Sequence, residues 1–128
     1  MNTRTEKLVV SLVLVVFFVA IASTLILQGF SLTKDEAIEI SRRSDTVQWY
    51  MDRVVSYSVE AYYWNSTKVN QVREEFPYLQ EQYPENRSVW TVIWHIHTCL
   101  HAYTSSSIIF HVIDDETGQI VYEDQGRN

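Results

Sequence analysis

One segment near the N-terminus limits what this chain can fold into. Residues 8–27 (LVVSLVLVVFFVAIASTLIL) contain no charged side chain, and their only hydroxyl groups belong to Ser11, Ser23 and Thr24. As a helix rising about 1.5 Å per residue, the segment would reach about 30 Å, the thickness of the hydrocarbon core of a bilayer. A helix also satisfies its backbone hydrogen-bonding groups internally, as lipid requires. The sequence therefore predicts a transmembrane helix that binds the bilayer through residues 8–27.

The charges on either side of this segment predict its orientation. Arg4 and Lys7 precede it, whereas no basic residue follows it before Lys34. Basic residues favour the cytoplasmic side of a membrane. We therefore expect a cytoplasmic N-terminus over residues 1–7, a signal anchor over 8–28 and an extracytoplasmic domain over 29–128, in a single-pass protein of the cell membrane.

A cleaved signal peptide is the alternative interpretation of the apolar segment. Residues 20–22 (AIA) have the small-x-small form that a signal peptidase accepts. The apolar run nevertheless continues to Leu27, beyond the about 7–15 apolar residues of a typical signal peptide, and this favours a retained anchor. Both interpretations place the domain on the same side of the membrane.

The composition of residues 29–128 excludes some classes of partner. They hold 15 acidic and 8 basic residues, a net charge of −7, and such a domain repels phosphate backbones and anionic lipid headgroups. We therefore expect no nucleic-acid binding. About one hundred residues suffice for one small domain. Its only cysteine, Cys99, cannot form an internal disulfide, so stability must come from an apolar and aromatic core.

Patterns typical of helices occur at the start of the domain and again between its predicted strands. Residues 33–36 (TKDE) form a capping box, in which Thr33 caps a helix and Glu36 reaches back to the cap, and Asp45 is placed to cap a second short helix. Residues 67–85 predict a third short helix followed by a loop, because helical spacing of apolar residues is interrupted there by prolines.

The remaining segments of the domain show patterns typical of β-strands. Residues 55–63 and 89–100 alternate with a period of two, and the second run places Trp90, Trp94 and Ile96 on one face. Residues 103–106 predict a turn, after which Ile108, Phe110 and Val112 continue the inward face. A tight turn at 114–118 leads to a last strand over 120–122. The predicted class is α+β, with an antiparallel β-sheet packed on one face by helix.

Three motifs resemble the PepSY-like family. They are T-x-x-E-A-x-x-I at residues 33–40, W-x-V at 90–92 and D-x-x-T-G at 114–118, in the family's order. The resemblance implies a domain similar to peptidase propeptide modules, which are thought to regulate peptidases and other envelope proteins by binding. It supplies no catalytic residues. The long segment between the first helix and Trp90, and the histidines, depart from the family's pattern.

The histidines raise the alternative of a metal-binding or metal-sensing module. His95 and His97 project to the same face of their strand, and a turn centred near residues 104–105 would place His111 opposite His97. Imidazoles facing each other across two strands can share Zn²⁺ or Cu²⁺. A solvated sheet face is the simpler interpretation. The acidic run at 114–116 lacks the ligand spacing of a calcium loop and is better explained as a turn.

No cofactor or enzyme activity is expected. Residues 105–107 place serines near His101, but no oxyanion hole or nucleophile elbow accompanies them. Tyr62 and Trp64, at the end of the first strand, suggest a binding site for a protein partner, because aromatic side chains beside a sheet edge anchor extended peptides. They are equally suited to cover residues 67–85. A non-catalytic module that binds and regulates a protein partner is therefore the leading hypothesis.

Overall fold

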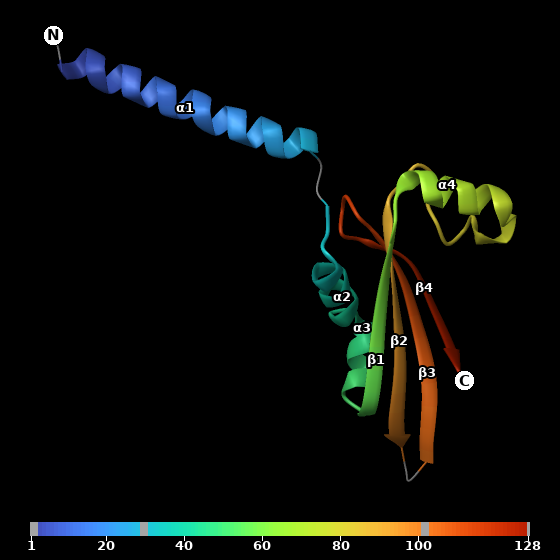
Figure 1. Ribbon diagram of the computed structural model, residues 1–128. Coiled ribbons are helices and arrows are strands. Elements are labelled where there is room, and N and C mark those ends of the chain that lie inside the picture. Colours follow the sequence, from blue (N-terminus) through green and yellow to red (C-terminus); the bar gives the residue numbers. More distant parts are fainter. Residues whose placement is uncertain (1–2, 29–30, 101–102, 128) are drawn as a thin grey trace. The chain divides into compact units, whose positions relative to one another are not determined.

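The computed structural model describes the backbone of residues 3–28, 31–100 and 103–127, and the side chains of 5–17, 31–99 and 103–126 (Figure 1). The chain divides into two units, Met1–Phe30 and Ser31–Asn128. The first unit is the helix α1 (Thr3–Gln28). Among the residues described, no helix combines the length and the apolar character needed to cross a membrane. Within the predicted span, the side chains after Phe17 lie outside the described residues.

The second unit begins with two short helices, α2 (Lys34–Arg42) and α3 (Asp45–Met51). The predicted capping box is confirmed, since Thr33 Oγ1 accepts from the Glu36 amide at 3.2 Å and Glu36 Oε1 accepts from the Thr33 amide at 3.3 Å. The predicted cap of α3 is wrong by one residue. Ser44 caps the helix, and Asp45 follows in the first turn, where its charge favours the positive end of the helix dipole.

Four antiparallel strands form one sheet in the order β1-β2-β3-β4 (Figure 1), so the α+β class is confirmed. The strands are β1 (Val54–Trp64), β2 (Val89–Leu100), β3 (Tyr103–Asp114) and β4 (Ile120–Arg127). Between β1 and β2 the chain forms α4 (Ser66–Glu75) and the 3-10 turn η1 (Pro77–Leu79), in agreement with the predicted helix and loop.

The face of the sheet covered by α2 and α3, here called the inner face, carries the main core. Trp94 and Ile96 of β2 and Ile109 of β3 are fully buried there, against Ala37 of α2 and Val47 of α3. Burial of each large apolar side chain stabilises a fold by about 1.5–3 kcal/mol. The alternation in β2 thus predicted the correct buried face for this strand.

The opposite face, here called the outer face, is covered at one end only. Val69 of α4 packs there against Val89 and Val112, and the rings of Trp64 and Tyr83 stack with centroids 5.1 Å apart. Helix is thus packed on both faces of the sheet, whereas the sequence predicted one. The reason is that α4 has its own buried apolar positions, three residues apart, which need a second surface.

The pairing of β2 with β3 differs from the prediction. His97 lies opposite Ser106 and Val92 opposite His111, and Tyr103 and Thr104 are paired strand residues rather than a turn. Ile109 and His111 therefore face inward, and Ile108 and Phe110 face outward. Because the two alternating sets in β3 hold equal numbers of apolar and aromatic residues, period-two alternation could not decide between them.

Candidate functional site

A chain of four polar side chains crosses the inner core from α2 to β4. Trp94 Nε1 donates to Ser41 Oγ at 2.7 Å, and Ser41 Oγ lies 2.6 Å from His111 Nδ1. His111 Nε2 lies 2.8 Å from Glu123 Oε2. The Ser41, Trp94 and His111 residues are fully buried. The ionised carboxylate of Glu123 can only accept, so Nε2 carries a proton. In the neutral ring Nδ1 then accepts from the Ser41 hydroxyl, whose oxygen accepts from Trp94 Nε1.

The Ser41–His111–Glu123 arrangement contains the side-chain types of a catalytic triad but not its working geometry. In a triad the serine bonds to Nε2 and the acid to Nδ1, whereas here the two partners are exchanged. Ser41 is also fully buried, so its hydroxyl cannot reach a substrate. This chain of hydrogen bonds therefore joins α2 to β4 and satisfies polar groups that the core would otherwise leave unpaired.

Glu123 is the end of this chain nearest to solvent, with a side chain that is 34% exposed. Burial is the largest single influence and raises the pKa of Glu123. Hydrogen bonds from Thr46, His111 and Gln125 together outweigh burial and lower the pKa below its ordinary value of 4.5. Thr46 Oγ1 donates to Oε1 at 2.7 Å and Gln125 Nε2 at 3.1 Å, so the carboxylate is held ionised by three elements of the fold.

The histidine metal site predicted from the sequence is not assembled. His95 and His97 lie on the outer face, whereas His111 is buried on the inner face and bonded to Ser41. His97 instead forms a hydrogen bond with Ser106, with 2.7 Å between its Nδ1 and Ser106 Oγ. Within the described residues no three His, Cys, Asp or Glu side chains are grouped closely enough to hold a metal. His101 lies outside them. The assumed register, five positions away from the real one, caused the error.

The acidic turn after β3 binds protein groups rather than an ion. Asp114 Oδ1 accepts from the amides of Glu116 and Thr117, and its Oδ2 lies 3.2 Å from Arg87 Nε. Asp115 Oδ1 accepts from the Leu32 amide at 2.9 Å and from Trp90 Nε1 at 3.1 Å. We call these two bonds the Asp115 clasp. The clasp fastens the first residues of the second unit to the end of the sheet.

Tyr62 and Trp64 have different surroundings, although both lie on the outer side of β1. Trp64 is half-buried between Tyr83 and Lys68 and thus covers the inserted segment, one of the two roles expected for it. Tyr62 is 50% exposed. Its hydroxyl donates to Glu60 Oε2 at 2.9 Å, and this hydrogen bond is the main cause that raises the pKa of Tyr62.

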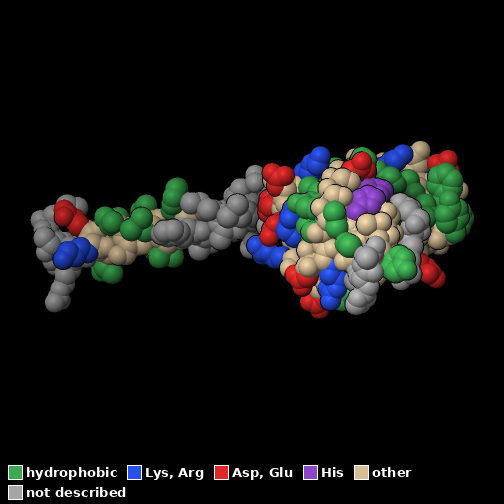
Figure 2. All heavy atoms as spheres, turned by 90° about the horizontal axis from the view of Figure 1, so that it is seen from below, with side chains coloured by type: hydrophobic (Ala, Val, Ile, Leu, Met, Phe, Trp, Pro, Cys, Tyr) green, Lys and Arg blue, Asp and Glu red, His purple; other side chains and the backbone are tan. Residues whose placement is uncertain are grey.

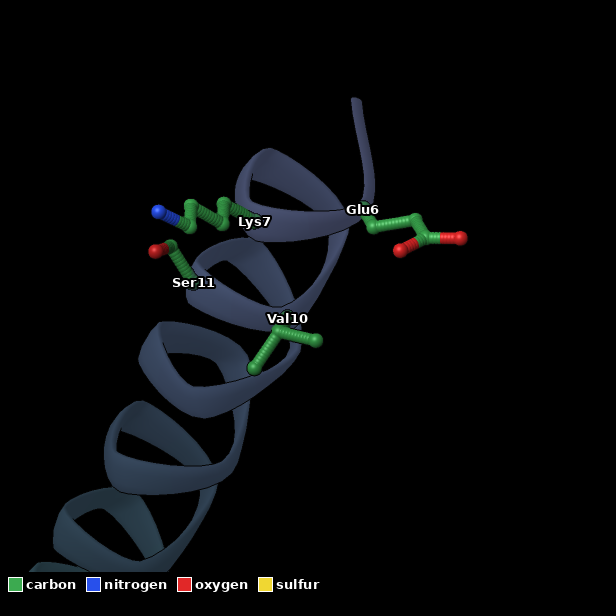
Figure 3. Close-up of a pocket in the computed structure, with 4 residues that line it drawn as sticks. All are labelled: Glu6, Lys7, Val10 and Ser11. Carbon is green, nitrogen blue, oxygen red and sulfur yellow. The ribbon is translucent and has the colours of Figure 1, made fainter. Parts of the chain in front are cut away.

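The first turns of α1 offer little to a ligand. Glu6, Lys7, Val10 and Ser11 line a shallow depression of about 500 Å³ along the first turns of α1 (Figure 3). All four belong to one helix, so no second wall encloses a bound molecule. In the view of Figure 2, acidic and basic side chains are mixed over the surface, and histidine is visible there. This face shows no basic patch of the kind that binds phosphate groups.

The sequence did not predict the buried hydrogen-bond chain. Ser41 lies four residues after Ala37 and so shares its face of α2, which is the signal that could have revealed the buried hydroxyl. A small hydroxyl residue within an apolar stripe often has a polar partner when it is buried. Comparisons with protein-family models, with curated proteins and with solved structures found no match. The arrangement of the chain's own residues must therefore carry any functional argument.

Proposed function

We propose that this chain is a membrane-anchored, extracytoplasmic, PepSY-like module that binds an extended segment of a protein partner and regulates it without catalysis. The observation that carries the proposal is the surface of β1. This strand is eleven residues long, lies at one edge of the sheet and exposes four large side chains. Those side chains are Val55 (65%), Tyr57 (45%), Tyr62 (50%) and Tyr63 (46%).

An edge of this kind favours strand addition. A terminal strand presents unpaired backbone N–H and C=O groups, and most proteins protect such edges with charged residues, proline or a covering segment. β1 has one charged residue, Glu60, and no proline. Tyr57 and Tyr63 are held in place by inner-face tryptophans, with ring centroids 5.8 Å from Trp94 and 5.3 Å from Trp90. Fixed aromatic rings anchor a partner at low entropic cost.

The other edge of the sheet differs. β4 carries the acidic pair Glu123 and Asp124, and its exposed apolar side chain is Val121. The acidic charge of the whole chain favours partner segments that are neutral or basic. Two features support a non-catalytic role. Ser41 is fully buried, and the two ring nitrogens of His111 meet the serine and the acid in the opposite order to a catalytic triad.

The PepSY-like part of the proposal rests on three motifs whose residues have structural tasks here. Thr33 and Glu36 cap α2, and Trp90 donates to the Asp115 clasp. Gly118 has a φ of +70°, a conformation that glycine adopts without strain. The resemblance alone suggests a peptidase or an envelope protein as the partner.

The anchor is a separate part of the proposal, carried by the uncharged residues 8–27. We expect the native protein to resist extraction from membranes by alkaline carbonate, because burial of about twenty mostly apolar side chains in hydrocarbon exceeds what peripheral contacts provide. Protease added outside intact cells should remove the second unit and leave a membrane-held stub. A soluble protein with its mature N-terminus at Ser23 would overturn the anchor.

The binding proposal is tested by site-specific photocrosslinking of the full chain in its native membrane. A photoreactive residue replaces Tyr62 on β1 or, as the matched control, Val121 on β4. We expect one partner from the Tyr62 position, a peptidase or another envelope protein, and none from Val121. In a second experiment the photoreactive residue is placed near the middle of β1, so that positions 62 and 121 are free for substitution. Capture of the partner should then fall at least fivefold with Tyr62→Lys and remain unchanged with Val121→Lys. Crosslinks to a second copy of the chain, or equal capture from both strands, would overturn the proposal.

A further inference from the structure

A depression of about 300 Å³ lies between α3 and β4, at the sheet edge opposite β1. Its walls are Thr46, Trp49 and Tyr50 of α3 and Gln125 of β4. Trp49 is 48% exposed, and its ring meets Tyr50 edge-on, with centroids 4.9 Å apart and an interplanar angle of 81°. Aromatic surface and a partly exposed carboxylate come together in this part of the second unit.

The carboxylate belongs to Glu123. Its Oε1 accepts hydrogen bonds from Thr46 Oγ1 and Gln125 Nε2, which are both groups of the lining residues. Because these donors are neutral, they orient the carboxylate without cancelling its charge. Their donation also leaves acceptor groups on the walls, namely the lone pairs of Thr46 Oγ1 and the amide oxygen of Gln125. The walls of the depression therefore offer acceptors, and the negative charge of Glu123 adjoins them through its bonds to two of the lining residues.

One face of the Trp49 ring already carries a cation of the protein itself. The guanidinium carbon of Arg53 lies 4.0 Å from the ring centroid, and Arg53 Nη1 donates to the Trp49 carbonyl at 2.7 Å. Tryptophan is the aromatic side chain that binds cations best through its face. Arg53 opposes the binding of a second cation here, because it occupies one face of the Trp49 ring and carries a positive charge.

We propose that this depression binds an organic cation, the ammonium or guanidinium group of a lysine or arginine side chain. Glu123 supplies the opposite charge, Thr46 and Gln125 supply acceptors, and Trp49 and Tyr50 supply the aromatic walls. The site is separate from β1 and does not depend on the function proposed for that edge. A cation bound here would interact with Glu123, which is the last member of the hydrogen-bond chain that begins at Trp94.

The test uses the full chain in detergent micelles, titrated with Nα-acetyl-argininamide, Nα-acetyl-lysinamide or the uncharged Nα-acetyl-norleucinamide. Binding is followed by NMR shifts of the Thr46 and Gln125 amides and of the Trp49 indole N–H. We expect saturable shifts with at least one of the two cations and none with the norleucine compound. The arginine and lysine arms identify the preferred headgroup. Shifts that fail to saturate, or equal shifts with the uncharged compound, would overturn the proposal.

Four variants sharpen the test. Glu123→Gln preserves the size of the side chain and should weaken binding at least fivefold, and Trp49→Ala, at an exposed position, should do the same. Arg53→Ala should tighten binding, because it frees the ring face and removes a like charge. Glu60→Gln removes a carboxylate from β1 and should change nothing. An equal loss with Glu60→Gln would show that only the net charge matters. Weaker binding with Arg53→Ala would overturn the role given to the face of the Trp49 ring.

Discussion

Ser41 and His111 lie 70 positions apart in the sequence and meet inside the core, with Ser41 Oγ 2.6 Å from His111 Nδ1. This contact joins α2 to the third strand of the sheet, and its continuation through Glu123 reaches β4. Polar groups in a low-dielectric core specify one arrangement of the surrounding elements, because every alternative packing leaves one of them without a partner. The pair thus fixes how α2 lies on the sheet.

Replacement of His111 tests this role. His111→Leu keeps a side chain of similar bulk but removes one hydrogen-bond partner from each of Ser41 and Glu123, so the free energy of unfolding should fall by about 1–3 kcal/mol. His97→Leu changes an exposed histidine and should stay within about 0.5 kcal/mol. Urea denaturation followed by circular dichroism measures both. Similar losses in the two variants would contradict the buried network.

Trp94 is expected to contribute most to the inner core. Trp94→Ala leaves a cavity at a fully buried position and should cost about 3–5 kcal/mol. His95→Ala, on the opposite and less buried face, should cost well under about 1 kcal/mol. The comparison is again made by urea denaturation. Equal costs would mean that the two faces of β2 are buried alike.

The acid side of the stability profile should depend on Glu123. Folding lowers the pKa of this group below 4.5, so its stabilising contribution is complete above that value and is lost as the pH falls through the lower pKa of the folded state. Glu123→Gln should therefore lower stability at neutral pH and flatten the decline below about pH 4.5. The measurement is urea denaturation between pH 7 and pH 3. Glu81→Gln, in an exposed loop position, is the control and should retain the wild-type decline.

The Asp115 clasp should protect the start of the domain. Asp115→Ala removes the acceptor of the Leu32 amide and one of the two acceptors of Trp90 Nε1, the other being the Leu32 carbonyl. The cost should be about 1–3 kcal/mol, and exchange of the Leu32 amide with deuterium should accelerate. Glu116→Ala breaks an exposed ion pair with Arg87 and should cost about 0–1 kcal/mol without changing that exchange rate. Unchanged protection of Leu32 in Asp115→Ala would exclude the clasp.

Local chemistry made much of the fold predictable. The hydroxyl of Thr33 and the carboxylate of Glu36 define a helix start wherever the chain goes, and the alternation around Trp94 marks a strand with one buried face. Such signals act over a few residues and depend little on the rest of the molecule. The helix positions, the strand order of the last three strands and the buried face of β2 followed from them.

The candidate site was less predictable, because it depends on register. A shift of one residue turns every side chain of a strand to the other face, and β3 offers apolar residues on both faces. Ile108 and Phe110 were assigned inward by their hydrophobicity, which left His111 on the wrong face. The Ser41 contact decides the true register, and no local pattern encodes a contact over that separation. The depression beside Trp49 likewise needs α3 and β4 together.

The Asp115 clasp also affects how the domain responds to a pulling force on its N-terminus. Tension applied to the chain ahead of Ser31 reaches the domain first at Leu32, where Asp115 holds the backbone to the turn between β3 and β4. The pull therefore enters the sheet at the end where that turn lies. It loads the two hydrogen bonds of the Leu32 backbone, to Asp115 Oδ1 and from Trp90 Nε1, before it loads α2. A domain tethered through its N-terminus would lose these bonds first under force, while the strands and the inner core stay intact.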